Sequence, residues 1–430
     1  MPATLKMDCL VVGDGPAGLA AATAVAWSGT EVALAGLGPS SPSQQADTRT
    51  AALFPPVIQL LRHLGAWDEL APASAPLRGI RIVDGTGRLL RAPEVVFRAD
   101  DIEKADLGHN VPNAALTGAL TAAARRAGVR FLDDGPVGGV DAATETATAQ
   151  MAGGRAIEAR LIVGADGRDS VCRQSAGIAV SRWTYEQAAI AVRFNHTRPH
   201  RGISTELHRP AGPCTTVPLP GNASSLVWVE RPGEVERLMA ATPEAFMAEL
   251  AELLGGLLGD ISALGVRRAF PLTGLKAETL ARRRIALVGE AGHVLPPIGA
   301  QGLNLGMFDV AVLADGIARA RTAGQDIGAP AVVEIYAQAR SADMRVRQGA
   351  VDFLNRTLTS GMLPLDLARG AGLHLLAATP ALRRRLMEQG LAPPAPLPAL
   401  MRPDFRPQQP TARPGSASRD PAAALEPSTS

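Results

Sequence analysis

A glycine-rich turn between an apolar strand and a helix constrains this chain more than any other feature. Residues 8–12 form an apolar strand pattern, and the motif GDGPAG (residues 13–18) follows at once. The Ala-rich stretch from Pro16 to Trp27 is typical of a helix, and residues 31–35 predict a second strand. The order strand, glycine turn, helix, strand predicts a βαβ unit with parallel strands.

The spacing of the glycines predicts a dinucleotide site. Gly13 permits the tight turn, Gly15 lets a pyrophosphate approach the backbone, and Gly18 lets the helix pack against the strand. The helix start offers N–H groups and a partial positive charge to the anion. An ordinary glycine-rich turn is the alternative, which the strand and helix context disfavours. The usual acidic ribose ligand at the end of the second strand is missing, because that position reads Ala35-Gly36.

Two further motifs follow apolar strand patterns. GADGRDSVCR (164–173) places Asp166 at the carboxyl end of a strand, where ligands collect in parallel sheets, although a plain turn is the alternative. GEAGH (289–293) and PPIGAQGLNLG (296–306) lead into another helix. The positive start of that helix would stabilise the negative charge that a flavin ring acquires on reduction.

These three segments together resemble the class A flavoprotein monooxygenases, the p-hydroxybenzoate hydroxylase-like group. More narrowly, they resemble the ubiquinone-biosynthesis hydroxylases of the UbiH/UbiF type. The resemblance covers about residues 7–390 in order. It includes Asp47-Thr48-Arg49 with Ala52-Leu53, Val111-Pro112-Asn113 with Leu116, Asp309, Tyr336 and Arg340.

The resemblance implies FAD as the bound cofactor and NAD(P)H as a transient co-substrate, since FAD takes the one GxGxxG motif. It implies that Arg49 reaches the FAD, with a simple salt bridge as the alternative. Glu290 stands where the family usually has Asp, at the ribityl or pyrophosphate region. Pro297 and Gln301 are the candidates for the flavin face, and no general acid or base is predicted. The remaining implied FAD contacts are Gly13, Gly15, Pro16, Ala17, Gly18, Asp166, Gly299, Gly302, Leu303 and Asn304.

The implied reaction is hydroxylation of the aromatic ring of a polyprenylated phenol with O2, through a flavin C4a-hydroperoxide. The implied partners are this lipid substrate and a ubiquinone-biosynthesis protein complex. The implied location is the cytoplasm, in peripheral contact with the inner face of the cytoplasmic membrane. Two alternatives stay open. One is a hydroxylase, epoxidase or reductase of another aromatic or isoprenoid substrate, and the other is a non-catalytic FAD-binding subunit of a biosynthetic complex.

The predicted fold class is α/β, a Rossmann-like FAD-binding domain with an inserted antiparallel β-sheet substrate domain and C-terminal helices. Residues 1–75, 100–180 and 273–325 would form the first domain, and 76–99 and 181–272 the second. Residues 326–392 would be helical, and the Pro-rich residues 393–430 disordered. Within these parts we expect helices at about 50–64, 113–127, 243–258 and 302–347, and a hairpin at 79–91 that turns at Asp84-Gly85.

Charge and cysteine usage narrow the function classes. With 43 basic and 41 acidic residues, the chain has no strong basic field, so we expect no nucleic-acid partner. Three scattered cysteines favour neither a disulfide framework nor a zinc cluster and fit a reducing cytosol. We predict no metal, no signal peptide and no spanning helix. His293 is predicted to be scaffolding rather than a base. Residues 383–385, three arginines beside leucines, fit either a membrane-surface patch or a solvated helix end.

Overall fold

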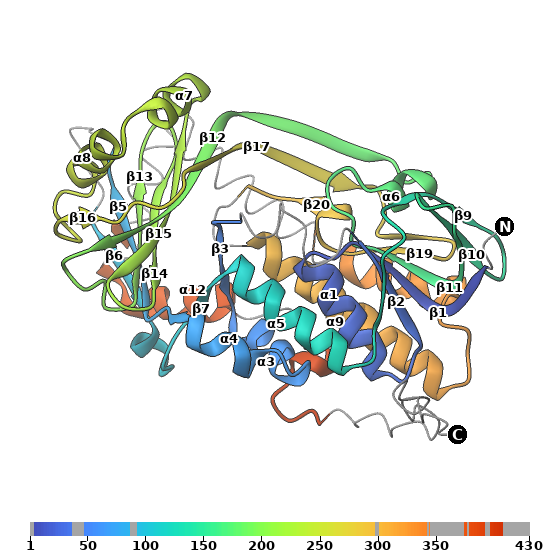
Figure 1. Ribbon diagram of the computed structural model, residues 1–430. Coiled ribbons are helices and arrows are strands. Elements are labelled where there is room, and N and C mark those ends of the chain that lie inside the picture. Colours follow the sequence, from blue (N-terminus) through green and yellow to red (C-terminus); the bar gives the residue numbers. More distant parts are fainter. Residues whose placement is uncertain are drawn as a thin grey trace, which may run out of the picture.

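A computed structural model describes residues 4–36, 47–86, 93–296, 301–341, 344, 374–375, 378–391 and 396–406. Its first sheet has a parallel centre (Figure 1). Its strands are, in spatial order, β18 (Ala281–Arg282), β19 (Ile285–Leu287), β11 (Ala156–Gly164), β1 (Leu5–Val12), β2 (Val32–Ala35) and β8 (Arg130–Leu132). All neighbours from β19 to β8 pair in parallel. The strand β10 (Ala147–Met151) pairs antiparallel with β11, and β9 (Val137–Ala142) pairs antiparallel with β10.

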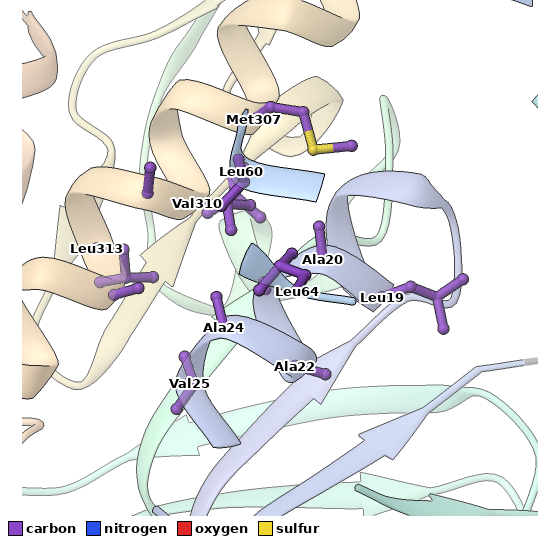
Figure 2. Packing of buried hydrophobic residues seen from close by; sticks show 14 of the residues in the cluster. Leu19, Ala20, Ala22, Ala24, Val25, Leu60, Leu64, Met307, Val310 and Leu313 are labelled. Carbon is purple, nitrogen blue, oxygen red and sulfur yellow. The ribbon is translucent and has the colours of Figure 1, made fainter. Parts of the chain in front are cut away.

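Helices cover one face of this sheet. They are α1 (Pro16–Trp27), α3 (Pro55–His63), α5 (Asn113–Arg126) and α9 (Gln301–Thr322). Nine of the twelve residues of α1 are buried, so this helix is enclosed on nearly all sides. Figure 2 shows Ala20 and Ala24 of α1 close to Leu64, which follows α3, and to Val310 of α9. Small alanine side chains therefore let the helix that follows the glycine motif pack closely against α9.

A second sheet is mainly antiparallel and lies beside the first (Figure 1). Its order is β20 (His293–Val294), β17 (Arg268–Ala277), β12 (Val180–His196), β15 (Ala223–Glu230), β14 (Cys214–Leu219), β13 (Ile203–His208), β5 (Gly79–Asp84) and β6 (Val95–Arg98), with β16 (Ile261–Ser262) paired to β12. Helices α7 (Pro232–Ala240) and α8 (Pro243–Leu253) pack on its outer face against Ile190, Phe194 and Trp228. The long strands β12 and β17 run from this layer to the first sheet.

A small sheet and short helices join the two layers. The sheet is β3 (Thr50–Leu53), β7 (His109–Pro112) and β4 (Ala75–Pro76). Residues 330–341 are helical. The other helical elements are α4 (Trp67–Leu70), η1 (Ala71–Ala73), η2 (Ala99–Ile102), α6 (Val171–Ser175), η3 (Gly289–Ala291), α12 (Pro380–Leu391) and η4 (Ala399–Met401). No helix of the described residues is long and apolar enough to cross a bilayer.

The fold class is confirmed, but several element boundaries were wrong. The helix expected at 50–64 is strand β3 followed by α3, because Pro55 and Pro56 fit only the first turn of a helix. The hairpin strand β5 pairs with β6, so its return begins at Val95 rather than directly after Gly85. Gly324, at φ +66°, interrupts the helix expected at 302–347. The helical insert begins at Pro232, earlier than expected.

The C-terminal segment is a further correction. Residues 396–406 were expected to be disordered, but Leu400 and Met401 are buried in the core beside α3 and α9. Asp315 of α9 accepts the N–H of Ala399 at 2.8 Å, and the Leu400 carbonyl bonds to His63. Residues 407–430 lie outside the described part of the chain.

Candidate FAD site

The glycine motif packs against two strand ends. Gly13 has φ +112°, and a Cβ there would lie 2.3 Å from the carbonyl oxygen of Ala165. A Cβ on Gly18 would lie 1.9 Å from the Gly13 carbonyl oxygen. The Gly13 N–H also donates to the carbonyl of Ala35 at 2.7 Å. Gly13 and Gly18 are therefore required by the protein itself, in the turn and in the packing of α1 on β1.

Gly15 differs from both neighbours in the motif. Its φ of −72° suits any residue, and a Cβ there would meet no described atom within 4 Å. It borders a groove of about 400 Å³ that is also lined by the end of β2 and by residues 165–167. The residue before α1 makes no side-chain cap hydrogen bond, so the helix start next to Gly15 keeps N–H groups that a ligand could bind. A phosphate anion fits this place, because the missing side chain leaves the room it needs.

Asp166 lines the same groove, at the end of β11. Its Oδ1 accepts the Ser170 hydroxyl at 2.6 Å, and its Oδ2 accepts the N–H of Cys172 at 3.0 Å. Ser170 in turn caps α6 by accepting the N–H of Arg173. The carboxylate thus shapes the turn that borders the groove, and its contact with FAD stays a prediction.

Two helix starts converge beside the groove. The Cβ of Ala17, in the first turn of α1, lies 3.2 Å from the position of a Cβ on Gly289, the first residue of η3 after β19. A Cβ on Gly306 of α9 would lie 3.1 Å from the Gly289 Cα. Glu290 follows, about half exposed, with its carboxylate 3.0 Å from the Nε of Arg168. The third motif therefore meets the first at the ends of parallel strands, as the ligand-binding edge of such a sheet requires.

The start of α9 holds four of the predicted flavin contacts, Gln301, Gly302, Leu303 and Asn304. Oε1 of Gln301 is buried and has no hydrogen-bond partner among the described residues. A hydrogen-bond donor on a ligand would satisfy this acceptor. The Asn304 amide bonds to the Phe54 N–H at 2.9 Å and the Ala52 carbonyl at 2.8 Å, so it fixes α9 to β3. Pro297 and Gly299, also predicted here, lie outside the described residues.

Arg49 lies at the junction of the two sheets. It forms two bonds of 2.8 Å with the Asp47 carboxylate, and its guanidinium lies 5.2 Å from the centre of the Phe270 ring. The hydrogen bonds that Arg49 donates to Asp47 raise the pKa of Arg49 above its ordinary value, against the effect of burial. The alternative of a salt bridge is therefore present in the structure, although Arg49 precedes a strand rather than a helix. Contact with FAD remains a prediction.

A buried ionic network holds the third motif in place. Asp309 of α9 is fully buried and accepts from the Gly289 N–H at 3.0 Å and the Arg340 Nε at 2.7 Å. His293 Nε2 lies 2.6 Å from the same carboxylate, which agrees with its predicted scaffolding role. The Tyr336 hydroxyl donates to the Leu287 carbonyl at 2.6 Å. Sequence reasoning recognised these residues one by one but not that they form one network.

The contacts between the sheets were missed entirely. Arg193 of β12 donates from Nε to the Thr48 carbonyl at 3.2 Å, and the hydroxyls of Thr50 and Ser225 lie 2.8 Å apart. Burial lowers the pKa of Arg193, with Asp47 acting in the opposite direction. Residues 189–193 alternate along a strand of alanine, isoleucine and valine, and the arginine at position 193 was the feature of the sequence that could have indicated this contact.

Two other histidines bond to neighbouring groups of the protein, and the cysteines are buried in it. His196 bonds to the Arg198 carbonyl and the Ser224 hydroxyl, and His200 to the Leu219 carbonyl. No group of three or more metal-binding side chains occurs within the described part of the chain. The three cysteines, Cys9, Cys172 and Cys214, are free and buried, and burial raises the pKa of Cys214 to about 12.

Comparison with known proteins assigns the family. The sequence model of the FAD binding domain family matches residues 6–345. The chain is 36% identical over 387 residues to ubiquinone hydroxylase UbiL of Rhodospirillum rubrum, covering 89% of each chain. It is 30% identical over 389 residues to 3-demethoxyubiquinol 3-hydroxylase of Escherichia coli, covering 89% of this chain and 98% of the relative. The chain belongs to the FAD-dependent ubiquinone hydroxylase family.

Solved structures agree on the fold. The p-nitrophenol 4-monooxygenase PnpA of Pseudomonas putida superposes with a TM-score of 0.73 at 17% identity, covering 90% of this chain and 98% of that one. HpxO of Klebsiella pneumoniae, solved with FAD, gives 0.71 at 19% identity, covering 89% and 97%. The predicted family resemblance is thereby confirmed, as are FAD and an FAD-dependent monooxygenase activity.

Proposed function

We propose that this protein uses NAD(P)H and O2 to hydroxylate the aromatic ring of a polyprenylated phenol in ubiquinone biosynthesis. Gly15 carries the FAD part of the proposal, because its missing side chain leaves open space in the groove at the start of α1, where a pyrophosphate would lie. The 36% identity to a ubiquinone hydroxylase over most of the chain supports the substrate class. Bound FAD would supply the oxygen activation that no protein side chain can provide.

The residues at the edge of the first sheet would hold the cofactor. Backbone groups of residues 13–18 would bind the pyrophosphate, with Asp166 and Glu290 along the polar part of FAD. The start of α9 would face the isoalloxazine, with its positive end towards the ring. Arg49 would approach from the junction of the sheets, where its charge is already balanced by Asp47. In this proposal residues 1–75, 100–180 and 273–325 form the FAD-binding domain. Residues 76–99 and 181–272 form the substrate domain.

The inner face of the second sheet would cover the substrate ring. Side chains alternate along β12, and Ile190 and Phe194 face the helices α7 and α8. The opposite face carries an apolar cluster that includes Ala189, Val229 and Leu272. Arg193 extends from this face to Thr48, so the face is turned towards the FAD-binding layer. An apolar face of this kind would exclude water from the reacting ring.

Peripheral membrane contact and membership of a biosynthetic complex form the outer part of the proposal. Leu375 and Leu386 are 55% and 43% exposed, and Arg384 and Arg385, which directly precede Leu386, are exposed too. Exposed leucines next to arginines suit an anionic lipid surface, where a polyprenylated substrate resides. Co-sedimentation with anionic vesicles tests this contact. The variant Arg384→Glu with Arg385→Glu should reduce it, and unchanged sedimentation would remove this part of the proposal.

The main test is genetic and chemical together. A strain that lacks the gene should accumulate a quinone precursor without one ring hydroxyl, and the wild-type chain should restore the product. The purified yellow protein should oxidise NAD(P)H and insert one oxygen atom from O2 into the phenol. Reduction of a double bond without O2 would favour a reductase instead. Flavin binding without turnover, with loss of partner proteins on deletion, would favour a non-catalytic subunit.

A further inference from the structure

The groove lacks a carboxylate at the place where this kind of fold usually has one. An acidic residue at the end of the second strand normally binds the ribose hydroxyls of a dinucleotide. Here β2 ends at Ala35, and both Ala35 and Gly36 line the groove without a polar side chain. The adenosine of FAD therefore needs another hydrogen-bond acceptor.

Asp14 occupies the space that a side chain at position 36 would fill. A Cβ on Gly36 would lie 2.6 Å from both Cβ and Cγ of Asp14, and 2.9 Å from its Oδ2. Gly36 is not among the residues with positive φ, so its backbone does not require glycine. The contact with Asp14 is what opposes a side chain there. Asp14 itself lines the groove, between the two glycines that border it.

We propose that Asp14 binds the ribose hydroxyls of FAD, in place of the acidic residue missing from the end of β2. This inference rests on the proposed function, since it requires that the groove holds FAD. The sign of the charge makes it testable. A carboxylate beside a pyrophosphate repels it, so a bystander Asp14 would weaken FAD binding, whereas a ribose ligand strengthens it.

The first experiment compares Asp14→Ala with the wild type in binding FAD and FMN, which lacks the adenosine. FAD affinity should fall about 10- to 100-fold, the range for a hydrogen bond to a charged group, and FMN affinity should stay the same. Asp169→Ala is the matched control. Asp169 lines the same groove, but its side chain is 88% exposed and pairs with Arg182 at 3.3 Å. This control removes the same charge and should leave FAD affinity unchanged or tighten it.

The second experiment moves the carboxylate back to the strand. Asp14→Gly removes the obstacle and should weaken FAD binding as Asp14→Ala does. Adding Gly36→Glu in that background should recover at least tenfold of the loss, whereas Gly36→Ala should recover nothing. In the wild-type background Gly36→Ala should weaken FAD binding by displacing Asp14.

The outcomes separate this inference from the function beneath it. Two outcomes overturn the role of Asp14 and leave the proposed function intact. One is equal or tighter FAD binding by Asp14→Ala, and the other is no recovery of FAD binding by the added glutamate in a folded protein. Circular dichroism of each flavin-free variant shows whether it is folded. A wild-type protein that binds no flavin overturns the proposed function as well.

Discussion

Replacing Asp309 by Asn should destabilise the protein strongly although the two side chains have nearly the same shape. Asp309 is fully buried between the Gly289 N–H, His293 and the guanidinium of Arg340, which is 2% exposed. The amide removes the negative charge that the buried guanidinium of Arg340 contacts. Breaking a buried pair in this way costs about 3–5 kcal/mol of the free energy of unfolding.

Asp315→Asn is the matched control on the same helix. Asp315 accepts the N–H of Ala399 at 2.8 Å, and burial raises its pKa, so folding does not favour its charged form. We expect less than about 1 kcal/mol for this change. Urea unfolding followed by circular dichroism measures both variants at neutral pH. A loss for Asp309→Asn within about 1 kcal/mol of the control would refute the ionic account of this network.

Three further predictions follow from single residues. Gly15→Val should abolish FAD retention with unchanged circular dichroism, whereas Gly118→Val, which also meets no described atom within 4 Å, should stay yellow. Gly274→Ala should cost about 1–3 kcal/mol, because its Cβ would lie 2.0 Å from the Trp183 ring, and unchanged tryptophan emission and stability would contradict this. The third concerns acid. Burial opposes ionisation of Asp309, but His293 and Arg340 outweigh it and lower its pKa. The stabilisation by the Asp309 carboxylate is therefore complete above the unfolded pKa of about 3.9 and is lost as the pH falls through the folded pKa. The urea concentration at the midpoint of unfolding should therefore decrease below about pH 4 in the wild type, and decrease less in Asp309→Asn.

The parallel sheet and its ligand edge were predictable because local patterns determine them. An apolar strand, a glycine turn and an Ala-rich helix lie within residues 8–27, and the two later motifs repeat the strand and turn. The boundary of the helix expected at 50–64 was wrong because the spacing of apolar residues was given more weight than the backbone restrictions of proline. Leu53, Val57 and Leu60 have helical spacing, yet Pro55 and Pro56 form the first turn of α3, and the strand β3 lies before them.

The contacts between distant segments could not be predicted, because they depend on which surfaces face each other after folding. Asn304 was expected to contact FAD, and the structure adds that its amide joins Phe54 and Ala52, about 250 residues earlier in the chain. The sequence predicted no role for Asp14. Its relation to Gly36 appears only when the loop after β1 and the end of β2 are seen side by side.

The three glycines of the motif show why a pattern match and a structural reason are different things. The protein itself forbids a side chain at Gly13 and Gly18, since each Cβ would lie within 2.3 Å of a carbonyl oxygen. At Gly15 the protein forbids nothing, because the backbone is ordinary and the space is open. A larger residue there would leave the folded chain intact and fill the groove. Gly15 is therefore the position where loss of FAD can be separated from loss of the fold, which the sequence pattern alone cannot indicate.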